Sequence, residues 1–233
     1  MKGIPMDQPQ YVITPPAQAS APVLGSSARF PVRRIFCVGR NYADHAREMG
    51  HDPDREPPFF FTKPADALLT DGADLPFPSA TEDLHHEAEL VVALGQGGRD
   101  IAVEDAAGLI WGAAAGIDFT RRDLQAEAKR MSRPWDMSKG FDHSAALGAL
   151  TQGPAPEKGR IWLSVDGEMR QDADLSDLIW SIPEVIAHLS RLVALAPGDL
   201  IFTGTPAGVS AVTRGQQVKV GIEGLAPLDT RIV

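Results

Sequence analysis

The sequence predicts an α+β fold with a β-rich core. Short apolar segments typical of strands recur along the chain, separated by many of its 22 glycines and 19 prolines. Helical periodicity is confined to a few scattered segments. No GxGxxG sequence follows a first strand, and the chain contains neither a phosphate-binding loop nor a CxxC pair.

The N-terminal half is expected to alternate strands with short helices. Residues 1–32 are rich in Pro, Ala and Ser, which predicts an N-terminal arm or edge strands. The main domain is expected to span residues 33–233. Its first predicted strands are 33–39, 59–62 (buried), 87–95 and 113–120, and its first predicted helices are 41–50, 103–112 and 121–131.

The C-terminal half is expected to contain one longer helix among strands. Strands are predicted within 160–170, where Asp166-Gly167 is typical of a hairpin turn. A helix is predicted over 182–195, because Pro183 suits a first helical turn and the apolar spacing fits 3.6 residues. Short strands are expected within 198–209, 216–222 and 229–233.

Composition excludes several partner classes. The net charge of −9 argues against a nucleic acid or a membrane surface as partner. The single cysteine, Cys37, stands in an apolar run, so we expect it to be buried in a reducing compartment. No apolar run is long enough for a membrane span, and the start MKGIPMDQPQ lacks the apolar region of a secretory signal. We therefore expect a cytoplasmic protein.

Three carboxylates form a candidate metal site. Glu87 and Glu89 stand two apart in LHHEAELVVALG, so in a strand they share one face. Asp118 stands among apolar residues in AAAGIDFT, where an unpaired charge is costly. Oxygen ligands of like charge favour Mg²⁺, Mn²⁺ or Ca²⁺. His85 and His86 are expected to support this site rather than bind the ion.

A simpler interpretation remains open for the same residues. Glu87 and Glu89 could lie on the solvated face of an edge strand, and Asp118 could cap the helix that begins at 121. Under that interpretation the carboxylates would bind no metal.

Basic residues between 121 and 139 favour an anionic ligand. This stretch carries a charge of +3 within a chain of −9. Arg122 is a candidate for a substrate carboxylate, as is Arg40 before the helix at 41–50, whereas Lys129 and Arg130 are assigned to a solvated helix face. The basic residues are Arg121, Arg122, Lys129, Arg130, Arg133 and Lys139, and the acidic ones are Asp123, Glu127 and Asp136.

Taken together, six motifs in order resemble the fumarylacetoacetate hydrolase family, from about residue 33 to the C-terminus. PPFFFTKPADAL and PWDMSKGFDHSA are most similar to the fumarylpyruvate hydrolases of gentisate-type aromatic degradation. The six motifs are GRNYADHAREMG, PPFFFTKPADAL, LHHEAELVVALG, GIDFTRRDLQ, PWDMSKGFDHSA and IFTGTPAGV.

The resemblance implies a mixed β-roll with a few peripheral helices, usually dimeric. It implies Mg²⁺ (or Mn²⁺) held by Glu87, Glu89 and Asp118. It also implies catalytic roles for His45 and Glu48 on a short lid helix. The resemblance further implies a catalytic role for Lys139 and substrate binding by Arg122, Gln125 and Thr205, to which Arg40 is added.

The implied activity is metal-dependent cleavage of a C–C bond in a 2,4-dioxo acid. Hydrolysis of fumarylpyruvate to fumarate and pyruvate is expected, with His45, three residues before Glu48 on one helical face, activating the water. The Gly and Pro residues after 42–49 predict that this helix closes over a ligand. Alternatives on the same fold are an acylpyruvase, an oxaloacetate decarboxylase or tautomerase, and a hydroxymuconate-type isomerase. A metal-dependent keto-acid-binding protein without catalysis is a further alternative.

Overall fold

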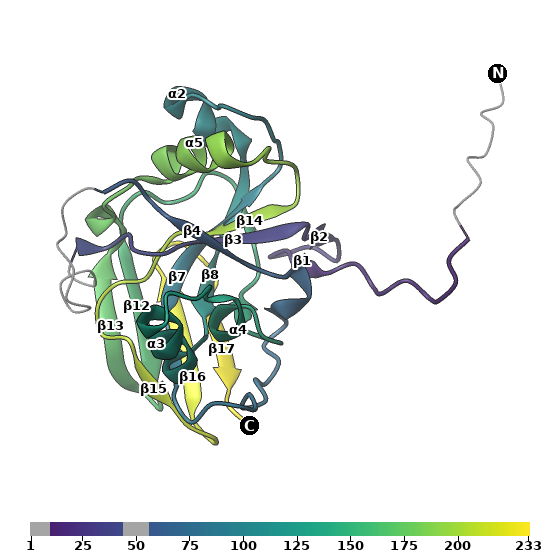
Figure 1. Ribbon diagram of the computed structural model, residues 1–233. Helices are drawn as coiled ribbons and strands as arrows, with labels where there is room; N and C mark the ends of the chain where they lie inside the picture. The colour runs from purple at the N-terminus through teal and green to yellow at the C-terminus, as the bar shows by residue number, and fades with distance from the viewer. Residues whose placement is uncertain (1–9, 44–55) are drawn as a thin grey trace.

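The computed structural model describes residues 10–43 and 56–233 (Figure 1). A mixed eight-stranded sheet forms the centre of the molecule. Its strand order is β4-β3-β14-β7-β8-β10-β5, and β11 also pairs with β8. The pairs β3–β14 and β5–β10 are parallel and the others antiparallel. The strands are β3 (Arg34–Val38), β4 (Phe60–Lys63), β5 (Leu68–Leu69), β7 (Ala88–Leu94), β8 (Ile110–Asp118), β10 (Ala145–Leu147), β11 (Thr151–Gln152) and β14 (Asp199–Phe202).

Three smaller antiparallel sheets accompany it within the described residues. Their orders are β13-β12-β16-β17, β15-β6-β9 and β1-β2. The strands are β1 (Ser20–Pro22), β2 (Arg29–Pro31), β6 (Leu84–His86), β9 (Thr120–Arg121), β12 (Arg160–Val165), β13 (Glu168–Asp174), β15 (Ser210–Val212), β16 (Gln217–Ile222) and β17 (Leu228–Arg231).

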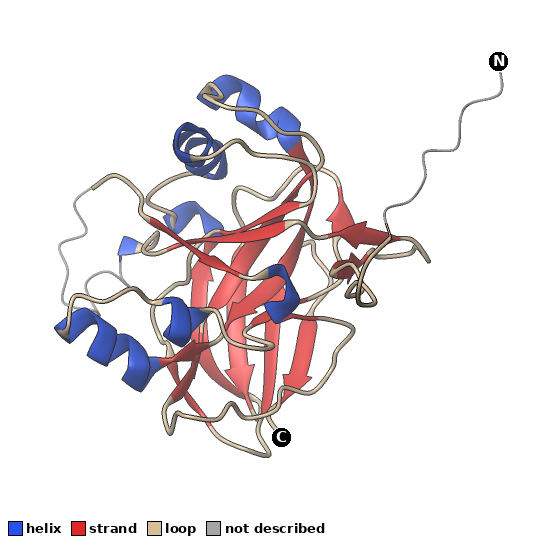
Figure 2. Cartoon of the chain, turned by 45° about the vertical axis from the view of Figure 1, so that its right-hand side comes forward, coloured by secondary structure: helices blue, strands red, loops and turns tan. Residues whose placement is uncertain are grey.

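Helices lie around the outside of the strands (Figure 2). The α-helices are α2 (Val103–Ala106), α3 (Arg122–Arg130), α4 (Asp136–Lys139) and α5 (Ile182–Leu192), and the 3-10 helices are η1 (Ala65–Ala67), η2 (Ala107–Leu109) and η3 (Leu175–Asp177). Among the described residues, no helix combines the length and apolar character needed to cross a membrane.

Strand β7 divides the core into two layers. Its residues alternate, so Leu90 and Val92 enter the cluster that contains β12 and β16, while Val91 and Ala93 enter the cluster on the other face. Burial of both faces explains why this strand is an unbroken apolar run after Glu89. Cys37 is buried as expected, in the second cluster, and burial raises the pKa of its thiol.

The predicted fold class is confirmed, and two elements differ from expectation. The helix predicted over 103–112 ends at Leu109, because Ile110 already belongs to β8 and pairs with Leu94. The strand predicted over 59–62 forms as β4, but it lies at the sheet edge, so Phe60 and Phe61 are only half-buried.

Other predicted elements form where the sequence placed them. Strand β7 and helices α3 and α5 match their predicted segments within a few residues, and Pro183 lies in the first turn of α5. The hairpin turn has Asp166 at φ 51° and Gly167 at φ 84°, the left-handed conformations that such a turn requires.

The N-terminal segment contains both kinds of structure that were expected. Residues 10–17 extend away from the body (Figure 1), whereas Ala21 and Phe30 of the β1–β2 pair are buried against the main sheet. The boundary between residues 1–32 and 33–233 stays a prediction.

Candidate metal centre and substrate pocket

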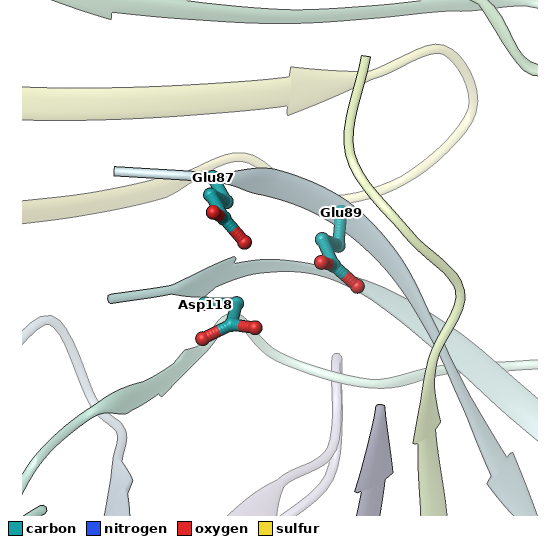
Figure 3. Close-up of side chains that lie close together, drawn as sticks. All are labelled: Glu87, Glu89 and Asp118. Atoms are coloured by element: carbon teal, nitrogen blue, oxygen red, sulfur yellow. The ribbon is translucent and has the colours of Figure 1, made fainter. Parts of the chain in front are cut away.

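Two neighbouring strands bring the three carboxylates together. Glu87 directly precedes β7, Glu89 is its second residue, and Asp118 is the last residue of the adjacent strand β8. The Asp118 backbone N–H donates to the Glu87 carbonyl at 2.9 Å, so these residues face each other across the ladder. Figure 3 shows the three side chains gathered between the strands. One potential ligand oxygen from each lies within 4.8 Å of the others.

Burial contradicts the simpler interpretation of these residues. Glu87, Glu89 and Asp118 are 5%, 1% and 0% exposed, so they do not form a solvated face. The helix α3 begins after Arg121 without a side-chain cap, so Asp118 does not cap it. Three buried carboxylates this close require compensating cations.

Lys139 supplies part of that compensation. Its Nζ donates to Glu87 Oε2 at 2.7 Å, Asp118 Oδ2 at 2.8 Å and Thr120 Oγ1 at 2.7 Å. Burial lowers the pKa of this ammonium, but Asp118 and Glu87 outweigh burial and raise it. In this arrangement Lys139 acts as a cation and as a hydrogen-bond donor to two of the carboxylates.

A second buried lysine, Lys63, was missed by sequence reasoning. Its Nζ lies 2.8 Å from Asp118 Oδ1 and donates to the carbonyls of Phe119 and Lys139. The Asp118 contact is an ion pair without hydrogen-bond alignment. A lysine before a proline at the end of a strand is usually exposed to solvent, so the local sequence did not indicate that Lys63 is buried beside Asp118. We call Glu87, Glu89, Asp118, Lys63 and Lys139 the inner end of the pocket.

Glu89 is the least compensated carboxylate of the inner end. Among the described residues it accepts from one donor, the Gly204 N–H at 2.8 Å. Gly204 has φ +103°, and a Cβ there would lie 2.7 Å from Asn41 Cβ, so the position requires glycine. Burial raises the pKa of Glu89 well above its ordinary 4.5, and Asp118 and Glu87 raise it further. A cation bound beside it would relieve this cost.

The donor set of the inner end fits a divalent cation. Three buried carboxylate oxygens within reach of one ion are hard ligands of the kind that Mg²⁺ and Mn²⁺ prefer. Their three charges are formally matched by Lys63, Lys139 and Arg122. A bound divalent ion would leave an excess of two positive charges, which favours an anionic ligand.

Two predicted substrate-binding residues lie together on α3. Arg122 donates to Glu87 Oε1 at 2.5 Å and to Gln125 Oε1 at 2.6 Å. Both line a narrow pocket that opens from the carboxylates. Arg122 therefore links Glu87 of the metal site to Gln125, which lies about one helical turn further along α3.

Thr205 lines the same pocket and is held from behind by Gln171. The Gln171 Nε2 donates to Thr205 Oγ1 at 2.7 Å and to the Pro206 carbonyl at 2.8 Å. Its Oε1 accepts from the Ala88 N–H, between the two glutamates, at 3.0 Å. Gln171 thus ties Thr205 to the metal-site strand. Sequence reasoning missed it, because it stands in a hairpin of mostly exposed residues.

The adjacent histidines support the strand instead of facing the ion. His86 contacts Gln171 Oε1 at 3.0 Å and Ser210 Oγ at 2.9 Å, which engages both ring nitrogens. Burial lowers the pKa of His86 to about 4, so its ring is neutral near pH 7. His85 contacts Asp83 at 2.9 Å.

The outer part of the pocket adds to one sequence prediction, because Lys129 is exposed on α3 as predicted and also reaches the pocket. Lys129, assigned to a solvated helix face, lines the pocket together with Arg40 and Trp135, whereas Arg130 does not. Lys129 Nζ lies 5.2 Å from the Trp135 ring centroid, and the Arg40 guanidinium lies 5.2 Å from that of Phe59. We call Arg40, Phe59, Lys129 and Trp135 the outer rim.

His45, Glu48 and most of the predicted lid helix lie outside the described residues. Their position relative to the carboxylates therefore stays a prediction.

The chain is similar to known proteins over most of its length. The chain is 51% identical to the fumarylpyruvate hydrolase of Pseudomonas aeruginosa, whose crystal structure contains Mn²⁺ and pyruvate, with a TM-score of 0.93 over 96% of this chain and 99% of that one. It is 39% identical to the mitochondrial oxaloacetate tautomerase FAHD1 of Homo sapiens, over 86% of this chain and 91% of the relative.

A third similarity is with an isomerase. The 5-carboxymethyl-2-hydroxymuconate delta-isomerase of Mycobacterium smegmatis is 31% identical, with a TM-score of 0.80 over 93% of this chain and 82% of that one. The family model described as "Fumarylacetoacetate (FAA) hydrolase C-terminal" matches residues 34–233. The chain belongs to the fumarylacetoacetate hydrolase family.

Proposed function

We propose that this protein is a metal-dependent hydrolase that cleaves fumarylpyruvate to fumarate and pyruvate. The observation that carries the proposal is its full-length similarity to the fumarylpyruvate hydrolase of Pseudomonas aeruginosa, at 51% identity. The buried carboxylates of the inner end support it, since they can hold the divalent cation that such a reaction uses. Manganese, which that relative contains, and magnesium both suit oxygen ligands.

The inner end is suited to a 2-keto acid. Glu87, Glu89 and Asp118 would hold the cation, which as a Lewis acid would polarise the keto acid. Arg122 and Gln125, directed into the pocket from α3, would bind the carboxylate of the pyruvoyl group. Thr205, held by Gln171, lies in the connection between β14 and β15 and would help to position the pyruvoyl group.

The reaction adds one water molecule across the C3–C4 bond of the substrate. Water adds to the C4 carbonyl and gives a proton to a base, for which the sequence offers His45 oriented by Glu48. The C3–C4 bond then breaks, its electron pair stays on the pyruvate fragment as an enolate, and a proton adds at C3. The fixed positive charge of Lys139 would stabilise that enolate.

A second function is favoured by a specific observation. The oxaloacetate tautomerase FAHD1 of Homo sapiens is 39% identical over most of both chains, and an oxaloacetate reaction would also pass through a stabilised enolate. Tautomerisation does not consume water, so it would not require a base that activates water.

Parallel assays separate these functions. The Mn²⁺- or Mg²⁺-loaded protein is incubated with fumarylpyruvate, acetylpyruvate and oxaloacetate, and loss of the diketone absorbance and formation of pyruvate are followed. We expect turnover of fumarylpyruvate, and His45→Ala should abolish it while leaving metal affinity unchanged. Turnover of oxaloacetate with none of fumarylpyruvate would overturn the proposal.

We also propose that the protein is a cytoplasmic homodimer. The extended segment before β1 exposes Tyr11, Val12 and Ile13, a concentration of apolar surface that favours contact with a second copy. A monomeric mass by light scattering at micromolar concentration would contradict the dimer.

A further inference from the structure

Four cations among the described residues line the pocket, and they divide into two pairs. Arg122 and Lys139 contact Glu87 at 2.5 and 2.7 Å. Arg40 and Lys129, at the outer rim, have no carboxylate partner among the described residues. Instead, each lies over an aromatic ring. We propose that Arg40 and Lys129 bind the second carboxylate of a dicarboxylic substrate, at the end opposite the pyruvoyl group. This inference rests on the proposed function.

The two cations belong to one continuous arrangement of side chains. The Phe59 and Trp135 rings meet edge to face, with centroids 5.5 Å apart, and each carries one of the cations. Gly39 makes this possible, because a Cβ at residue 39 would lie 2.0 Å from the Phe59 ring. The outer rim is therefore built by packing: Lys129 is exposed and Arg40 half-buried, and each lies over one of these rings.

Electrostatics at the outer rim favour an anion. Burial lowers the pKa of Lys129, and the charges of Arg122 and Arg40 lower it further. These like charges repel one another in a pocket wall, while the inner end is formally balanced before a metal binds. A carboxylate between Arg40 and Lys129 would offset that repulsion and gain charge-assisted hydrogen bonds.

The wall between the two ends suits a flat acyl chain. Phe61, Trp135 and Lys139 line both the narrow pocket and an adjoining cavity of about 500 Å³. Phe61 and Trp135 lie side by side with ring centroids 5.9 Å apart and planes tilted by 60°, so this part of the wall is aromatic. A substrate with its keto acid at the inner end would extend its acyl group along these rings. A second carboxylate on that group would reach the outer rim, whereas a monocarboxylic acyl group would leave the rim cations unpaired.

Paired substrates test the assignment. Lys129→Met keeps the length of the side chain and removes its charge, Lys129→Arg keeps the charge, and Arg130→Met is the matched control on the same helix outside the pocket. For fumarylpyruvate we expect Lys129→Met to raise KM about 10- to 100-fold, the range for a lost hydrogen bond to a charged group. For acetylpyruvate, which lacks the second carboxylate, KM should stay within about twofold.

The two control variants define what would overturn the inference. Lys129→Arg should retain most of the affinity for fumarylpyruvate, and Arg130→Met should match the wild type with both substrates. Equal effects of Lys129→Met on the two substrates, or no effect on either, would remove Lys129 from the proposed subsite.

A binding measurement keeps the test independent of the proposed reaction. Fumarate and crotonate, which differ by one carboxylate, are titrated into protein saturated with Mn²⁺ and pyruvate. We expect fumarate to bind more tightly, and Lys129→Met to abolish that difference. If the wild type hydrolyses neither substrate, the proposed function fails, while a fumarate preference would still support the subsite. Equal binding of fumarate and crotonate by the wild type would overturn it.

Discussion

The inner end and the outer rim of the pocket hold their charges in opposite ways. At the inner end, the carboxylates and lysines are buried and contact one another at 2.7 to 2.8 Å. At the outer rim, Arg40 is half-buried and Lys129 exposed, and each cation lies 5.2 Å from the centroid of an aromatic ring. Removing a charge from the inner end leaves an oppositely charged buried partner uncompensated. Removing a charge from the rim leaves no buried partner uncompensated and changes only the attraction for an anionic ligand. Changes at the inner end should therefore affect metal binding and stability, and changes at the rim should affect substrate choice.

Asp118→Asn should produce the largest effect. The substitution keeps the shape of the side chain but removes a metal ligand and the charge shared by Lys63 and Lys139. We expect Mn²⁺ affinity to fall at least about 100-fold and turnover to be lost with it. Calorimetric titration with Mn²⁺ checks this, with Asp71→Asn on the surface as the control. Unchanged affinity would remove Asp118 from the site.

Lys63→Met should cause the next largest effect, on stability. It leaves Asp118 without one of its two cations, and breaking a buried ion pair in this way costs about 3–5 kcal/mol. Denaturant unfolding measures the change, with Lys219→Met, an exposed lysine on β16, as the control. If both variants unfold at the same denaturant concentration, the buried lysine does not compensate the carboxylates.

The effect of pH should also separate the metal-free from the metal-loaded inner end. In the metal-free protein, burial raises the pKa of Glu89 above 4.5, so above that pH the folded chain keeps a proton that the unfolded chain releases. The contribution of Glu89 to the free energy of unfolding then falls as pH rises from about 4.5.

A bound cation reverses that contribution, because it holds the carboxylate deprotonated. The stabilisation by Mn²⁺ should thus grow as the pH rises above about 4.5, and should grow less in Glu89→Gln. Unfolding with EDTA or Mn²⁺ across this range measures it. A stabilisation that is independent of pH in the wild type would contradict the raised pKa.

Thr205→Val should have the smallest effect, since Thr205 carries no charge and lines the pocket through a neutral hydroxyl held by Gln171. The change removes one hydrogen bond from Gln171, worth about 0.5–1.5 kcal/mol, so we expect KM to rise by no more than about tenfold. Metal affinity should be unchanged, in contrast to Asp118→Asn. Steady-state kinetics check this against Thr213→Val, an exposed threonine; a loss of metal affinity would make Thr205 part of the metal site.

The sequence predicted the parts of the pocket that follow from local pattern. Glu87 and Glu89 were predicted because a spacing of two on a strand fixes a common face, and Asp118 because a carboxylate among apolar residues requires a partner. Arg122 and Gln125 were identified by resemblance, and their spacing of three brings them together on α3.

Other residues depend on tertiary contacts that no local pattern encodes. Lys63 is buried because β4 ends beside Asp118, which lies 55 positions later in the chain. Gln171 reaches Thr205 from a hairpin with exposed neighbours. Lys129 is exposed on α3 as predicted, but its position 5.2 Å from the Trp135 ring centroid depends on a tertiary contact.

The most direct measurement is a crystal structure of the protein soaked with Mn²⁺, with anomalous diffraction used to locate the ion. We predict one manganese peak about 2.0–2.6 Å from oxygens of Glu87, Glu89 and Asp118. No such peak, with Asp118 and Glu87 still paired to Lys63, Lys139 and Arg122, would contradict the proposed metal centre.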